Sequence, residues 1–185
     1  MPATAVKSFA IANIAAVDII EEKENNPKTY RLIQVASKAT ATPFISQGKD
    51  EELRVNNTIH AQNITEDITK GYEITFETVK AVMEVLALVD GGTWDGAQNK
   101  YSGAVAGKPT QRVPFTLKVY TAQKDYDGEN KAFICFTFKH CKGTPISFNI
   151  QDGTFLTQEM KLKSRPKFNE NAVEMATMQE IPEIP

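Results

Sequence analysis

The sequence predicts a mainly β protein with one short helix, in which two antiparallel sheets pack together as a β-sandwich or barrel and the helix lies at the side. Apolar and polar residues alternate along several segments, as they do in half-buried strands. Only one segment, 79–89, places its apolar residues at helical spacing. Strand patterns do not alternate with helical ones, which argues against a parallel sheet with a nucleotide crevice.

The first half of the chain contains one strong strand pattern and three weaker ones. Along 71–78, the apolar residues Tyr72, Ile74 and Phe76 alternate with the polar residues Glu73, Thr75 and Glu77. This pattern predicts a strand with one buried and one polar face. Weaker strand patterns occur at 9–20, near 30–35 and at 58–64.

The predicted helix follows the 71–78 strand directly. Thr78 is a plausible N-cap, because its hydroxyl is able to accept a hydrogen bond from a free backbone N–H of the first turn. Asp90 and Gly91 provide a stop signal, since glycine adopts the left-handed conformation that ends many helices. We therefore expect a helix of about three turns between these two residues.

The second half of the chain reads as two hairpins. Strands at 112–122 and 131–139 flank Asp127-Gly128, a pair that favours a primed hairpin turn. Strands at 145–150 and 154–164 flank Gln151-Asp152-Gly153, which suggests a second turn of the same kind.

Composition indicates one domain spanning 1–185. The chain is 24% charged and 41% hydrophobic with a formal net charge of -2, so it lacks the basic excess of a nucleic-acid-binding surface. The two cysteines form no C-x-x-C pair and no disulfide framework, which favours a reduced, intracellular chain with both thiols buried.

No motif supports an enzyme, a cofactor or a metal. In "GAVAGKPT", 103–110, two glycines and a lysine imitate a phosphate loop, but the spacing is one residue short and Pro109 replaces the hydroxyl residue. His140 and Cys141 are adjacent, yet only His60 and Cys135 could complete a zinc site. We therefore expect no catalytic residue, no cofactor and no metal ligand.

Three segments are expected to be connections or arms: a long connection at 38–57, a glycine-rich loop at 91–111 and a C-terminal arm at 167–185. A hairpin needs a loop of only two to five residues, so a connection as long as 38–57 suggests that this segment has a function of its own. Candidate inter-subunit contacts in the three segments are Phe44, Ile45, Lys49, Asp50, Trp94, Tyr101, Val173 and Met175.

Several segments in order resemble the major tail protein, or tail tube protein, of siphophages that infect Gram-positive bacteria. They are "GYEITFETVKAVMEVLALVDGGTW", then "VPFTLKVY", the Asp-Gly hairpin, "HCKGTP" and "KSRP". The resemblance covers roughly 70–166, and the first 65 residues match only in general pattern. We identify no additional immunoglobulin-like domain and expect the bare tube unit.

The resemblance implies a structural protein of the virion tail, assembled in the host cytoplasm. Proteins of this family form hexameric rings, in which strands of all subunits line a channel, and the rings stack into a tube that conducts DNA during ejection. Implied partners are other copies of the chain, the tape measure protein, the tail terminator and the distal tail protein. DNA is expected to pass without specific binding.

Two further expectations concern the assembled tube. Since DNA is densely negative, we expect acidic and polar residues to outnumber Lys and Arg in the channel, with Glu73, Thr75 and Glu77 as candidate lining residues. We also expect 38–57 and the C-terminal arm to become ordered only in the tube, with Phe44 buried against an adjacent ring.

Two alternatives to the tube subunit stay open. One is a stand-alone β-sandwich module that binds sugar or protein through Trp94 and Tyr101. The other is a tail terminator or head–tail connector, which would form single rings but no long tubes.

Overall fold

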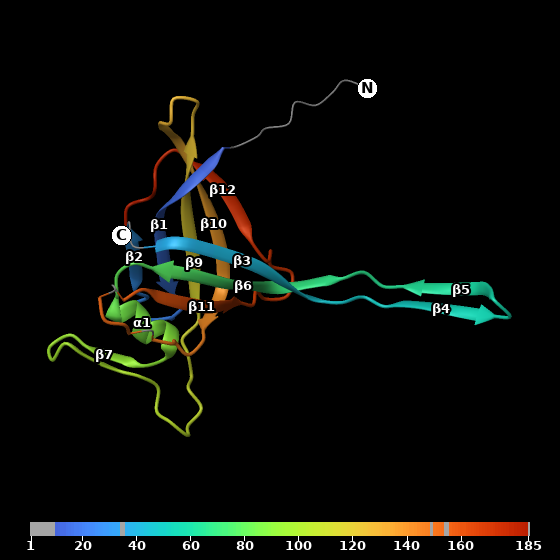
Figure 1. Ribbon diagram of the computed structural model, residues 1–185, viewed down its shortest axis with the longest axis horizontal. Helices are drawn as coiled ribbons and strands as arrows, with labels where there is room; N and C mark the ends of the chain where they lie inside the picture. The colour runs from blue at the N-terminus through green and yellow to red at the C-terminus, as the bar shows by residue number, and fades with distance from the viewer. Residues whose placement is uncertain (1–9, 34–35, 149, 154–155, 185) are drawn as a thin grey trace.

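The computed structural model describes residues 10–33, 36–148, 150–153 and 156–184. One antiparallel sheet forms the body, with the hydrogen-bonded order β2-β1-β9-β10-β11-β6-β3 and with β12 added beside β10 (Figure 1). Two separate ribbons, β4-β5 and β7-β8, complete the β structure. The strands are β1 (Ile11–Glu21), β2 (Thr29–Ile33), β3 (Ala36–Ser46), β4 (Asp50–Val55), β5 (Thr58–Ile64), β6 (Ile68–Thr78), β7 (Thr93–Asp95), β8 (Lys100–Ser102), β9 (Phe115–Lys124), β10 (Asn130–Gly143), β11 (Gln158–Ser164) and β12 (Glu174–Met178), and the helix is α1 (Met83–Asp90).

The body sheet folds over at the junction of β10 and β11. These two strands share only a short register, from Cys141 opposite Ser164 to Gly143 opposite Leu162. Beyond it, β11, β6 and β3 turn back across β1 and β9 (Figure 1). The expected two packed antiparallel layers with a flanking helix are thus confirmed, although hydrogen bonds join both layers into one sheet.

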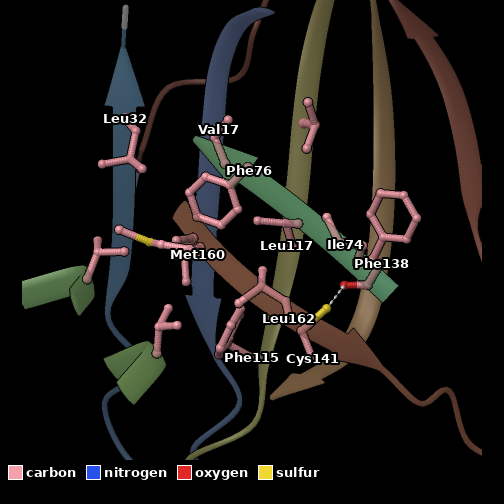
Figure 2. Close-up of a cluster of buried hydrophobic side chains, with 14 residues drawn as sticks. Val17, Leu32, Ile74, Phe76, Phe115, Leu117, Phe138, Cys141, Met160 and Leu162 are labelled. Carbon is pink, nitrogen blue, oxygen red and sulfur yellow. Dashed lines mark hydrogen bonds between the residues drawn. The ribbon is translucent and has the colours of Figure 1, made fainter. Parts of the chain in front are cut away.

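The core lies between the two layers. Phe76 of β6 and Met160 of β11 belong to the same buried cluster as Val17 of β1 and Leu117 of β9 (Figure 2). Val85 and Val89 of α1 are fully buried in this cluster as well. The helix therefore closes one end of the core, which explains the helical spacing of its apolar residues.

The hairpin at Asp127-Gly128 is confirmed. Strand β9 pairs with β10 from Phe115 opposite Cys141 to Lys124 opposite Asn130. Gly128 has a φ of 80°, the left-handed conformation that glycine adopts without steric cost. The alternating pattern and the turn pair were therefore sufficient to place this hairpin.

The helix ends as predicted and begins later than predicted. Gly91 is left-handed with φ 82°, and its N–H donates to the carbonyl of Ala87 at 2.9 Å. The N-cap prediction for Thr78 is wrong: the helix starts after Val82, without a side-chain cap. Thr78 is instead the buried last residue of β6, where its hydroxyl donates to the Gln158 carbonyl at 3.5 Å. Because Thr78 pairs with β11 as part of this strand, it does not cap the helix.

The prediction of a long connection at 38–57 is wrong. Strand β3 runs through this segment to Ser46, paired with β6, and the chain continues into the β4-β5 ribbon. Asn56 and Asn57 both have positive φ, 45° and 64°, so they form a primed turn at the tip of the ribbon. The Asn-Asn pair was the available sequence signal for this hairpin.

The strand expected at 145–150 is absent from the described residues of that segment. Ile146 donates its N–H to the carboxylate of Asp90 at 3.2 Å, which turns the chain towards the end of α1. Phe148 and Ile150 are exposed, and β11 begins only at Gln158. The apolar spacing therefore suggested a strand, whereas the backbone N–H of Ile146 bonds to the side chain of the last residue of α1.

The C-terminal segment is ordered within the chain, which corrects the expectation that it orders only in a tube. Strand β12 pairs with β10 from Phe133 opposite Met178 to Thr137 opposite Glu174. The glycine-rich segment also contains a short ribbon, β7-β8, and residues 103–110 connect this ribbon to β9. A strand and not a helix follows them, so they lack the context of a phosphate loop.

Candidate assembly surfaces

The β4-β5 ribbon projects far from the body of the molecule (Figure 1), and we call residues 49–67 the arm. Every residue of β4 and β5 is exposed. Four large apolar side chains on the arm are 49 to 61% exposed: Leu53, Val55, Ile59 and Ile64. Because β-branched and leucine side chains gain free energy by leaving water, the arm presents unused apolar surface.

The arm is also acidic. It carries five carboxylates, at Asp50, Glu51, Glu52, Glu66 and Asp67, and the only cationic side chains on it are Lys49 and Arg54. Arg54 pairs with Glu52 at 2.5 Å, and Lys49 lies 3.9 Å from Glu51. Lys49 and Asp50, expected as contact residues, lie at the base of the arm, where the Lys49 N–H donates to Thr65 Oγ1 at 2.7 Å.

Phe44 does not lie in a loop but in a strand, which corrects its expected location, and its role as an inter-subunit contact stays a prediction. It lies in β3 opposite Gly71, and the ammonium of Lys163 is 4.5 Å from the centroid of its ring. The Phe44 ring therefore already has a partner in its own chain. Its neighbour Ile45 is 43% exposed and remains a candidate for an intermolecular contact.

The expected channel residues Glu73, Thr75 and Glu77 lie on the outward face of β6. Their cross-strand neighbours in β11 are Lys163, Lys161 and Glu159, and Lys163 forms a 2.6 Å ion pair with Glu73. Positive and negative side chains are therefore interspersed on this face. Among these six residues the acidic and polar ones outnumber the lysines, and the assignment of this face to a channel stays a prediction.

Trp94 and Tyr101 lie opposite each other in the β7-β8 ribbon. The Tyr101 hydroxyl donates to Asp90 Oδ2 at 2.6 Å, and burial together with this carboxylate raises the pKa of Tyr101. Tyr101 therefore ties the ribbon to the helix. Trp94 instead lines a hollow of about 420 Å³, together with Tyr30 and Glu21.

The two C-terminal candidates differ in their surroundings. Val173 packs against the main core cluster and is part of the body. Met175 is 61% exposed on β12. Met175 is therefore the more accessible of the two, and the role of both as inter-subunit contacts stays a prediction.

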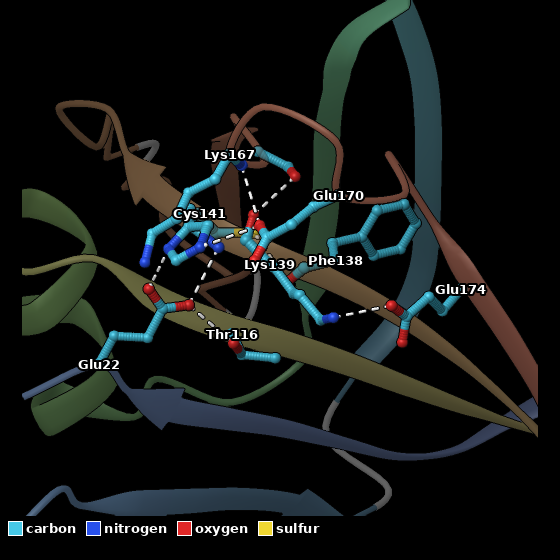
Figure 3. A network of polar contacts seen from close by, with 10 residues as sticks. Glu22, Thr116, Phe138, Lys139, Cys141, Lys167, Glu170 and Glu174 are labelled. Atoms are coloured by element: carbon cyan, nitrogen blue, oxygen red, sulfur yellow. Dashed lines mark hydrogen bonds and ion pairs between the residues drawn. The ribbon is translucent and has the colours of Figure 1, made fainter.

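A polar network that the sequence analysis missed joins the C-terminal segment to the body (Figure 3). His140, with φ 51° at an irregularity of β10, contacts the carboxylate of Glu22 through Nδ1 and that of Glu170 through Nε2, the latter at 3.2 Å. Glu22 also accepts from Thr116 Oγ1 at 2.7 Å. Since residues 22, 140 and 170 are far apart in sequence, no local pattern indicated this network.

The two cysteines behave as buried structural residues. Cys135 and Cys141 are both free and buried, as expected. Burial raises the pKa of the Cys141 thiol to about 12, so the thiol stays protonated at neutral pH. Among the described residues no group of His, Cys, Asp and Glu is arranged to hold a metal ion.

Comparisons with known proteins give one structural likeness. No protein-family model matches the chain, and no curated protein matches it. Among solved structures, the chain is similar to a chain in the cryo-EM structure of the anti-feeding prophage (AFP) baseplate, 6-fold symmetrised. The sequence identity is 12%, the alignment covers 95% of this chain and 97% of that chain, and the TM-score is 0.40. At this identity and TM-score the likeness carries no argument about function.

The described part of the chain contains no helix that is both long and apolar enough to cross a membrane.

Proposed function

We propose that this protein is the structural subunit of a phage tail tube, in which hexameric rings stack into a hollow tube that conducts DNA. The observation that carries the proposal is the arm, a two-stranded ribbon in which every strand residue is exposed and which presents four large apolar side chains. An isolated hairpin gains little stability from its own contacts. We therefore infer that the apolar side chains of the arm are buried against a neighbouring subunit.

The order of the elements supports the same proposal. The segments that resemble tail tube proteins fall on distinct parts of the fold: "GYE" in β6, "VLALVDGG" in α1 and the two residues after it, "PFTL" at the start of β9, "HCKG" at the end of β10 and "KS" at the end of β11. The family's arrangement of two packed β layers with a helix at the side is the arrangement found in this chain.

Energetics favour association through the arm. Full burial of one Val, Leu or Ile side chain contributes roughly 1.5–3 kcal/mol. Four such residues project from each arm, and each subunit of a ring would repeat the contact. In the described chain the body sheet ends at β2 and β3, and sheet edges are natural sites for pairing with another chain.

In the proposed virion, the tube subunit contacts other copies of itself, the tape measure protein, the tail terminator and the distal tail protein. DNA moves through the lumen without specific binding, and assembly takes place in the host cytoplasm. No catalytic step, cofactor or metal is part of this function.

Electron microscopy of the concentrated, purified protein tests the proposal, with sedimentation velocity as a second measurement. We expect rings and long hollow tubes. Single rings that never stack would support a terminator or connector. A strict monomer at every salt concentration would contradict the tube and favour a binding module, for which the hollow beside Trp94 is the candidate site.

A further inference from the structure

A cluster of four cationic side chains lies around the C-terminal end of β11. We call this cluster the basic patch, and its members are Lys70, Lys142, Lys163 and Arg165. Two surface hollows meet here, of about 530 and about 450 Å³. Lys163 and Arg165 line both hollows, Lys142 lines the first, and Lys70 lines the second.

The basic patch has more positive charge than its own chain neutralises. Lys142 lies directly opposite Lys163 in the β10-β11 pairing, and like charges in this position are unfavourable. Lys163 has one ion-pair partner, Glu73, at 2.6 Å. Within the described residues, Lys70, Lys142 and Arg165 form no ion pair, so three cations are available to an anionic partner.

Apolar groups are part of the same surface. Phe44, Ile45 and Pro166 line the second hollow beside Lys70. The guanidinium carbon of Arg165 lies 6.0 Å from the centroid of the Phe44 ring. A partner that fits this surface therefore carries both carboxylates and apolar side chains.

The arm has this combination, and we propose that the arm of one subunit docks on the basic patch of a second copy. The five carboxylates of the arm complement the four cations of the patch. In this contact Leu53 or Val55 of the arm lies against Ile45 and Pro166 of the second copy. This inference rests on the proposed function and adds the receiving surface to it.

The contact must join two molecules. The arm continues from the end of β3, and its two strands extend away from the body (Figure 1), so most of the arm lies far from the patch of the same chain. An arm and a patch are different surfaces, which makes the contact heterologous. Heterologous contacts close into rings or extend into filaments, as stacking requires.

Three double variants of the full chain test the contact. The patch variant is Lys70→Glu with Lys142→Glu, and the arm variant is Glu51→Lys with Glu66→Lys. All four residues are exposed. The control, Lys108→Glu with Lys131→Glu, reverses two exposed lysines elsewhere and changes the net charge by the same amount as the patch variant.

We expect the patch variant and the arm variant each to weaken self-association in sedimentation velocity by at least about tenfold, which corresponds to about 1.4 kcal/mol. The control should associate like the parent. An equimolar mixture of the patch and arm variants should regain association, because each intact arm then meets an intact patch. Increasing the salt concentration from about 50 to about 500 mM should weaken the parent's association, since salt screens exposed charges.

The patch variant should also fold at least as stably as the parent, because it removes the Lys142–Lys163 opposition. A patch variant that associates like the parent would overturn the contact and leave the tube proposal intact. Arm-dependent association into irregular oligomers would support the contact and contradict the tube. If the parent binds duplex DNA through the patch, and the patch variant loses only that binding, the contact is also overturned.

Discussion

The ammonium of Lys163 lies 4.5 Å from the centroid of the Phe44 ring, so a β11 side chain covers a β3 side chain across β6. The same lysine forms an ion pair with Glu73 at 2.6 Å. Phe44 is therefore part of the body of the folded chain, and a substitution here changes the stability of the monomer before it affects assembly.

Phe44→Ala should lower the free energy of unfolding by about 1–2 kcal/mol, through lost apolar burial and a lost cation–π contact. Urea denaturation followed by circular dichroism measures the change. Phe44→Leu is the matched control, which keeps most of the apolar area and loses only the aromatic contact. Equal stability of the alanine variant and the parent would mean that the ring is not covered.

Leu53→Ser with Val55→Ser should leave the monomer intact and reduce assembly. The two residues are separated by one position in β4, so they share a face of the arm. Because both are exposed, we expect the free energy of unfolding to change by no more than about 0.5 kcal/mol. Electron microscopy should show fewer and shorter tubes.

The matched control for this pair is Val105→Ser with Ile150→Ser, which removes two exposed apolar side chains outside the arm. It should assemble like the parent. Tubes of normal number and length from the arm variant would show that its apolar residues do not contact a neighbour.

Gly71→Ala should destabilise the protein strongly, by about 3 kcal/mol or more. Gly71 has φ 149°, and a Cβ there would run into the carbonyl oxygen of Ser164 in β11. Gly107 has φ 75° and no atom within 4 Å of such a Cβ. Gly107→Ala should therefore cost only the conformational penalty of about 1–2 kcal/mol, and thermal melting of both variants separates the steric effect from the conformational one.

Glu170 should make stability depend on pH in the acidic range. The Lys167 N–H, which donates to this carboxylate, and then the charge of His140 hold the pKa of Glu170 below its ordinary value of 4.5. A lowered pKa stabilises the fold above the unfolded-state pKa, and the contribution is lost as pH falls through the folded-state pKa. The stability difference between the parent and Glu170→Gln should thus be largest near neutral pH and shrink below pH 4.5.

Denaturant midpoints of both proteins, measured from neutral to acidic pH, test this dependence. Glu180→Gln serves as the control, because Glu180 lies in the same C-terminal segment and is exposed. A difference between parent and Glu170→Gln that stays constant down to acidic pH would show that the carboxylate does not anchor the segment.

The sequence by itself determined the elements whose signals are local. The alternation on both sides of Asp127-Gly128 located the β9-β10 hairpin, and Gly91 marked the end of α1. Short-range periodicity and turn chemistry suffice for these elements, because both partners of each contact lie within one short stretch of chain. The same reasoning identified the polar face of Glu73 and its neighbours.

Only the tertiary structure decided the contacts between distant segments. Thr78, the expected N-cap of the helix, pairs with Gln158 as the last residue of β6. The C-terminal segment is ordered because β12 pairs with β10. The clustering of Lys142 with Lys163 depends on where the sheet folds over, at the short β10-β11 register. Such registers are selected by the packing of the whole core, so no local pattern in the sequence reveals them.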